Sequence, residues 1–114
     1  MKTQFVPYEQ ALALKELGFD EECLSYYFNK QLSFGTRTSY GEVIEVPLYQ
    51  QAFKFFRDKY DLYYTIEGSK KYGFAFFIYY ENDDKGELKS KEYSTYEEAE
   101  QECLIKLIEI VKNK

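Results

Sequence analysis

The sequence contains no histidine and no tryptophan, and its 114 residues include only two cysteines and two prolines. Histidine is the usual general base at neutral pH and the commonest metal ligand, so its absence removes most catalytic and metal-binding arrangements. Cys23 and Cys103 lie far apart and form no C-x-x-C pair, which leaves a zinc ion without a ligand set. We therefore expect a protein that is not an enzyme and has no catalytic residue, no metal and no cofactor.

Long apolar runs are missing as well. No segment approaches the roughly 20 residues that span a bilayer, and residues 1–7 contain no apolar stretch of signal-peptide length. We expect a cytoplasmic protein with no membrane partner, in which both cysteines are small core residues. A disulfide between Cys23 and Cys103 stays open, because it depends on their separation in space.

Positive charge is in deficit. Fifteen lysines and arginines stand against twenty aspartates and glutamates, for a formal charge of −5. A generic binder of the phosphate backbone needs a basic surface, so this balance makes a nucleic-acid partner unlikely. Aromatic residues are abundant instead, with 13 tyrosines and 10 phenylalanines. These rings either line half-exposed sheet faces or form an interaction surface, where tyrosine is common.

The periodicity of apolar residues predicts three helices, over 7–17, 48–59 and from Thr95 onward. Shorter apolar runs between turn-forming residues predict strands over 25–28, 32–34, 62–66, 72–80 and 88–93. The order α-β-β-α-β-β-β-α predicts an α+β fold with one small antiparallel sheet and three helices. The length suits a single compact domain over residues 1–114.

The last helix carries the clearest signals. Thr95 with Glu98 three residues later forms a capping box that starts the helix. Its predicted buried stripe consists of Ala99, Cys103, Leu104, Leu107, Ile108 and Val111.

One short pattern recurs at the start of all three predicted helices. Each copy reads tyrosine, two polar residues and alanine, beginning at Tyr8, Tyr49 and Tyr96. The tyrosine and the alanine share a helix face, so the ring can lie against a sheet while the alanine permits close approach. The pattern indicates a repeated packing solution or a decayed duplication rather than a solenoid.

The apolar run 71–79 is the main candidate for a binding motif. It resembles the RNA-recognition-motif signature, in which alternate aromatic residues of a central strand stack on bases, here Phe74 and Phe76. The match departs from the signature because Tyr72 separates the lysine from the glycine, and because no strand follows the last helix. The alternative is a central strand that is buried on both faces.

Acidic clusters suggest no catalytic chemistry. Residues 82–87 lack the spacing of a calcium-binding loop and have the composition of a turn. The carboxylates of 20–22 follow a predicted helix end, and those of 97–102 lie at the start and on the solvent face of another helix. Acid–base catalysis by two carboxyl groups needs environments that give them different pKa values, and neither place provides them.

Several segments together resemble an uncharacterised family of small proteins from phages, prophages and mobile elements of Bacteroidetes bacteria. The similar segments are 5–9, 14–21, 49–53, 96–100 and 103–109. The resemblance implies an origin in a phage or mobile element and a location in the host cytoplasm. It implies no mechanism and assigns no functional residue.

These observations favour a small acidic binding protein, an accessory factor that acts through contacts with an unidentified protein. The alternatives are a single-stranded RNA or DNA binder that uses Phe74 and Phe76, and a minor virion component. In strand 72–80, Phe77 and Tyr79 point away from Phe74 and Phe76, so both faces need cover, and these four residues are the candidate binding residues. We expect a second copy, as a homodimer, or a partner to cover the second face, unless the loop 35–45 does so.

Overall fold

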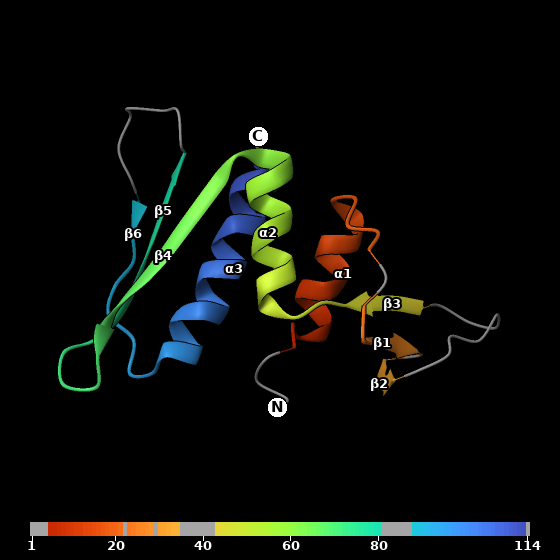
Figure 1. Cartoon of the computed structure of the whole chain (residues 1–114), viewed down its shortest axis with the longest axis horizontal. Coiled ribbons are helices and arrows are strands. Elements are labelled where there is room, and N and C mark those ends of the chain that lie inside the picture. Colours follow the sequence, from red (N-terminus) through yellow and green to blue (C-terminus); the bar gives the residue numbers. More distant parts are fainter. Residues whose placement is uncertain (1–4, 22, 29, 35–42, 81–87, 114) are drawn as a thin grey trace. The chain divides into compact units, whose positions relative to one another are not determined.

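The computed structural model describes residues 5–21, 23–28, 30–34, 43–80 and 88–113 (Figure 1). The elements follow the order α-β-β-β-α-β-β-β-α, which confirms the α+β class. The chain divides into two compact units, Met1–Ala52 and Phe53–Lys114, and the strands form two three-stranded antiparallel sheets rather than the expected single sheet. The single domain over residues 1–114 stays a prediction.

The first unit is built around a small sheet. Its elements are α1 (Tyr8–Glu16), β1 (Ser25–Phe28), β2 (Gln31–Phe34) and β3 (Val43–Val46). Strand β1 is central and runs antiparallel to both neighbours. Helix α1 packs on β3, whose side chains Ile44 and Val46 are buried. The core of this unit therefore lies between α1 and the β3 side of the sheet.

Helix α1 has the predicted start and stop signals. It follows Pro7, whose extended backbone suits the position before a helix. It ends where Gly18 takes a positive φ of 102°, and the N–H of Phe19 then donates to the carbonyl of Leu14 at 2.9 Å. This bond satisfies one of the carbonyls that a helix end leaves without a partner.

Strand β3 was not expected from the sequence, which predicted a loop over 35–45. Residues 35–42 lie outside the described residues, whereas Val43–Val46 pair with all four residues of β1. The carboxylate of Glu45 also accepts the backbone N–H of Cys23 at 2.7 Å, which ties β3 to the segment before β1. Part of the segment proposed to cover a second sheet face is therefore itself a strand of the first unit.

The second unit is a β-meander with helices. Helix α2 (Tyr49–Tyr60) begins in the first unit and continues into the second, and then come β4 (Leu62–Ser69), β5 (Gly73–Tyr80), β6 (Leu88–Lys89) and α3 (Tyr96–Lys112). The sheet order is β4-β5-β6. The predicted strand 62–66 extends to Ser69, and the predicted strand 88–93 shortens to two residues.

The short β6 has a physical cause at Ser90. Its hydroxyl accepts the backbone N–H of Phe76 at 2.8 Å, so a side chain replaces a ladder bond. Beyond Ser90 the chain pairs with β5 again only at an isolated bridge between Phe74 and Tyr93. The segment that contains β6 has one more residue than β5 between these two pairings. This β-bulge ends the regular strand.

Helix α3 confirms most of its predicted features. The hydroxyl of Thr95 accepts the N–H of Glu98 at 3.1 Å, which caps the helix start. Five members of the predicted stripe are buried: Ala99, Cys103, Leu104, Leu107 and Ile108. The sixth, Val111, is only half-buried in the last turn.

The recurring tyrosine–alanine pattern also has a consistent place. Tyr8, Tyr49 and Tyr96 are the first residues of α1, α2 and α3. Ala11, Ala52 and Ala99 are all buried. The two sheets have different strand orders, β2-β1-β3 and β4-β5-β6. The pattern therefore marks a shared way of packing the first helical turn, and the topology itself is not duplicated.

Candidate functional site

Helices cover one face of the β4–β5–β6 sheet. Residues directly opposite each other in antiparallel strands share a face, and Tyr64 lies opposite Ile78. The Tyr64 ring stacks on Phe53 of α2 with a centroid distance of 3.9 Å. On the same face, the Phe74 ring meets Tyr96 of α3 edge-on at 6.1 Å. Helices α2 and α3 accordingly lie on the same side of this sheet (Figure 1).

The predicted stacking pair lies on this covered face. Phe76 is 4% exposed, and its ring stacks on Tyr93 with a centroid distance of 6.3 Å. Phe74 is half-buried against Tyr96. A nucleotide base cannot reach the Phe76 ring in this arrangement. The interpretation of Phe74 and Phe76 as a base-stacking pair stays a prediction, and it has to account for helices that contact the same face of the sheet.

The other two predicted binding residues lie on the opposite face. Phe77 and Tyr79 are half-buried, and the ring contacts that α2 and α3 make with this sheet lie on its other face. The Tyr79 ring stacks on Tyr63 of β4 at 5.9 Å with an interplanar angle of 21°. We call the surface formed by Tyr63, Phe77 and Tyr79 the aromatic face.

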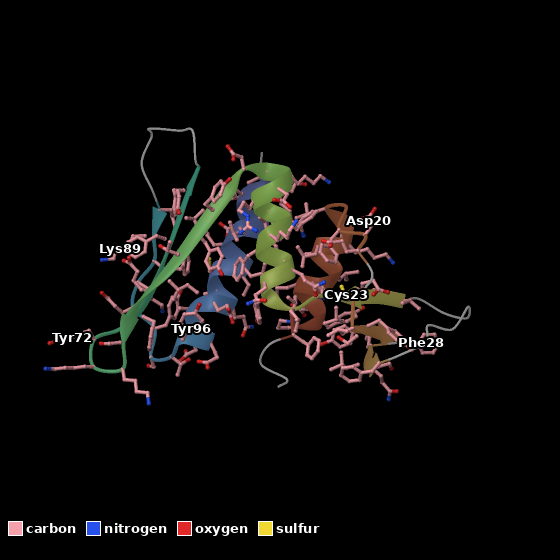
Figure 2. The ribbon with its side chains drawn as sticks, viewed as in Figure 1. Asp20, Cys23, Phe28, Tyr72, Lys89 and Tyr96 are labelled. Atoms are coloured by element: carbon pink, nitrogen blue, oxygen red, sulfur yellow. The ribbon has the colours of Figure 1, made fainter. Side chains whose placement is uncertain are left out.

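Charged and polar side chains border the aromatic face. Phe77 lies opposite Thr65 on one side and Lys89 on the other. The Lys89 ammonium lies 5.9 Å from the centre of the Phe77 ring, within the range of a cation–π contact. Figure 2 shows Lys89 on the side of the sheet away from α3. Aromatic rings with a polar border are common in the interfaces of protein complexes.

Sequence reasoning missed Tyr63 and Lys89. Their place follows from the strand register, which sets Tyr63 opposite Tyr79 and Lys89 opposite Phe77. The alternating apolar pattern of 72–80 correctly separated Phe77 and Tyr79 from Phe74 and Phe76. The sequence does show aromatic residues and lysines in the two predicted strands that flank 72–80. Only the strand register, however, selects Tyr63 and Lys89 from among them.

The covered face perturbs the titration of Tyr64. Burial, together with the smaller effects of the nearby Tyr96 and Glu100, raises the pKa of this phenol to about 12. The neutral phenol is thus favoured in the folded chain, whereas the unfolded chain has a phenol pKa near 10.0. The stability that this shift contributes is complete below pH 10 and is lost as the pH rises toward 12.

We expect the urea midpoint of the native chain to fall between pH 10 and 12. Tyr64→Phe should reduce this fall, because it removes one phenol that ionises more readily in the unfolded chain. The fall should not vanish, since burial also raises the pKa of Tyr93 and Tyr96. Tyr72→Phe is the matched control, since Tyr72 is 73% exposed at the β4–β5 turn. Equal slopes in all three proteins would contradict the assignment.

Both cysteines lie in the core, and Glu100 lies close to one of them. Cys23 and Cys103 are free and buried, which confirms them as core residues. Burial and the nearby Glu100 raise the pKa of the Cys103 thiol, which disfavours the nucleophilic thiolate. Burial also raises the pKa of the Glu100 carboxyl, with Glu97 as a second cause. Glu100 and Cys103 also lie close enough to Tyr64 to raise the pKa of its phenol.

Within the described ranges, no three histidine, cysteine, aspartate or glutamate residues lie close enough together to hold a metal ion. The acidic segment 82–87 falls in the part of the chain that is not described. None of the described helices is long and apolar enough to cross a membrane.

Comparison with known proteins adds no further assignment. No family model, no curated protein and no solved structure matches this chain.

Proposed function

We propose that this chain is a non-enzymatic binding protein that acts through protein–protein contacts at its aromatic face. One observation carries the proposal: Phe77 and Tyr79 stay half-exposed on the sheet face opposite the one that carries the ring contacts with α2 and α3. Tyrosine and phenylalanine at such a surface supply large, rigid contact area at low entropic cost. An apolar face of this kind is a usual mark of an interaction site.

The biological setting is part of the same proposal. The resemblance to small proteins of phages and mobile elements of Bacteroidetes supports an accessory factor that acts on a host protein in the bacterial cytoplasm. The formal charge of −5 favours a partner with a basic surface, since opposite charge speeds encounter and excludes acidic competitors.

The test is affinity capture from a Bacteroidetes lysate with the tagged full chain. Phe77→Ser combined with Tyr79→Ser should abolish capture of a specific host protein. Tyr72→Ser should not, because Tyr72 is equally aromatic and 73% exposed but lies in the β4–β5 turn outside the aromatic face. Circular dichroism of both variants shows whether the fold is kept.

Two results would redirect the proposal. If the native chain sediments as a dimer at micromolar concentration and the double variant as a monomer, a second copy covers the aromatic face instead. If the native chain retains single-stranded oligonucleotides with an affinity that falls steeply with salt, the partner is a nucleic acid. Capture that is unchanged in the double variant would contradict the aromatic face as the site.

A further inference from the structure

The first unit has an apolar hollow on a different surface. Its volume is about 520 Å³, and it is lined by Phe5, Pro7, Tyr27, Leu32 and Phe34. All five side chains are apolar or aromatic, and the Tyr27 hydroxyl is the polar side-chain group. A hollow of this size and lining is within the usual range for the binding of a bulky apolar group.

The hollow exists because α1 covers only part of its sheet. Leu32 lies opposite Tyr27, and Phe34 lies opposite Ser25, so these residues share one face. The Tyr27 ring meets Tyr8 of α1 edge-on at 5.2 Å, which places α1 on this face. The β3 side is buried beneath α1, whereas Phe34 on the β2 side is 61% exposed.

The hollow lies beside an unpaired strand edge. Strand β2 is the outer strand of the order β2-β1-β3, and no described strand pairs with its other side. An outer strand presents backbone N–H and C=O groups in the pattern that another extended chain can use. Leu32 and Phe34 belong both to this edge and to the lining of the hollow.

From this combination we propose that β2 binds an extended peptide segment of another protein, which adds a strand to the sheet and places a bulky apolar side chain in the hollow. Backbone hydrogen bonds to the edge would supply affinity, and the hollow would select the side chain. This site is separate from the aromatic face and does not depend on the function proposed there.

Charge selects the direction of the peptide. Lys30 directly precedes β2 and is exposed. Among the described residues, it is the charged residue next to this strand in the sequence. In antiparallel pairing the carboxyl end of the peptide lies at the Lys30 end of β2. A free C-terminal carboxylate there meets an opposite charge, so the occupant is the C-terminal segment of its protein, bound antiparallel.

The length of the edge favours a peptide over a second copy of the chain. Strand β2 has four residues, which corresponds to roughly 13 Å of extended backbone. A stable interface between folded proteins buries about 1,600 Å² in total, far more than one short edge and one hollow supply. A segment of about six residues matches the edge and the hollow together.

The test uses a labelled hexapeptide of alternating threonine and leucine with a free C-terminal carboxylate, titrated into the full chain and followed by fluorescence anisotropy. Phe34→Ser should weaken binding at least tenfold, because it removes one wall of the hollow. Leu24→Ser is the matched control and should leave binding unchanged, since Leu24 is 70% exposed and does not line the hollow. Hydrogen exchange of the β2 amides should slow when the peptide binds.

A double-mutant cycle between Lys30 and the peptide carboxylate tests the role of Lys30. Lys30→Gln and a C-terminally amidated peptide should each weaken binding several-fold, and combining them should cost little more than either alone. Three results would overturn the proposal: no measurable binding, equal binding of a peptide methylated at its backbone nitrogens, or dimerisation of the chain that Phe34→Ser abolishes. Equal binding of the methylated peptide would mean that the hollow binds a side chain without strand pairing. Dimerisation that Phe34→Ser abolishes would mean that a second copy of the chain pairs with the edge.

Discussion

Phe56→Ala is expected to lower the free energy of unfolding by about 3–5 kcal/mol, the usual cost of truncating a fully buried phenylalanine. Phe56 lies in the middle of α2 with 0% of its surface exposed. Its ring contacts Phe55 edge-on at 5.4 Å and lies 6.0 Å from the Tyr60 ring. Truncation removes the transfer energy of the ring and leaves a cavity that these neighbours cannot fill.

The matched control is Phe55→Ala, one residue earlier in the same helix. Phe55 is only half-buried, so the same truncation should cost less than half as much. Urea denaturation followed by tyrosine fluorescence measures both losses, provided that the denaturant slope is unchanged. Equal losses would mean that α2 presents a different face to the core than the one described.

The helices could be predicted because their signals are local. The stripe that includes Phe53 and Phe56 predicted a helix over 48–59, and α2 spans Tyr49–Tyr60. Thr95 and Glu98 likewise predicted the start of α3. A capping bond joins residues three apart and a helix face repeats every 3.6 residues, so both are visible within a short window of sequence.

The sheets could be predicted only in part because strand pairing is non-local. Strand β1 pairs with β3, which begins about one sixth of the chain later, across residues that carry no hairpin signature. The four residues Val43–Val46 are too few to show a clear alternating pattern, and the polar Glu45 in their middle is explained only by its bond to Cys23. The division into two sheets follows from pairing partners, which no local window contains.

The candidate site shows the same boundary between local and non-local information. Period-two alternation placed Phe77 and Tyr79 opposite to Phe74 and Phe76, and this separation is confirmed. Both sets are apolar, so the alternation did not show which set α3 would cover. The Phe74–Tyr96 contact answers that question, and it joins β5 to α3, between which β6 lies in the sequence.

The second large effect is expected at Gly68, where alanine should lower the free energy of unfolding by about 3 kcal/mol. Gly68 has a φ of +145°, a region that side-chain-bearing residues rarely adopt. A Cβ atom at this position would also collide with the carbonyl oxygen of Gly73 and lie 2.7 Å from the Cα of Phe74. Both obstacles are backbone atoms of the paired strand, so relief requires the β4–β5 ladder itself to move.

Gly73→Ala separates the close approach from the backbone conformation. Gly73 also has a positive φ, of 84°, but a Cβ atom there would lie 3.1 Å from the Cβ of Glu92 and 3.2 Å from the carbonyl oxygen of Tyr93, which are tight contacts rather than a collision. Both variants carry a conformational cost, whereas only Gly68→Ala forces two strands apart, so it should lose clearly more stability in urea titrations. If Gly73→Ala costs as much or more, the positive φ alone determines the loss. The tight approach of β4 to β5 beside the turn would then contribute nothing to the choice of glycine.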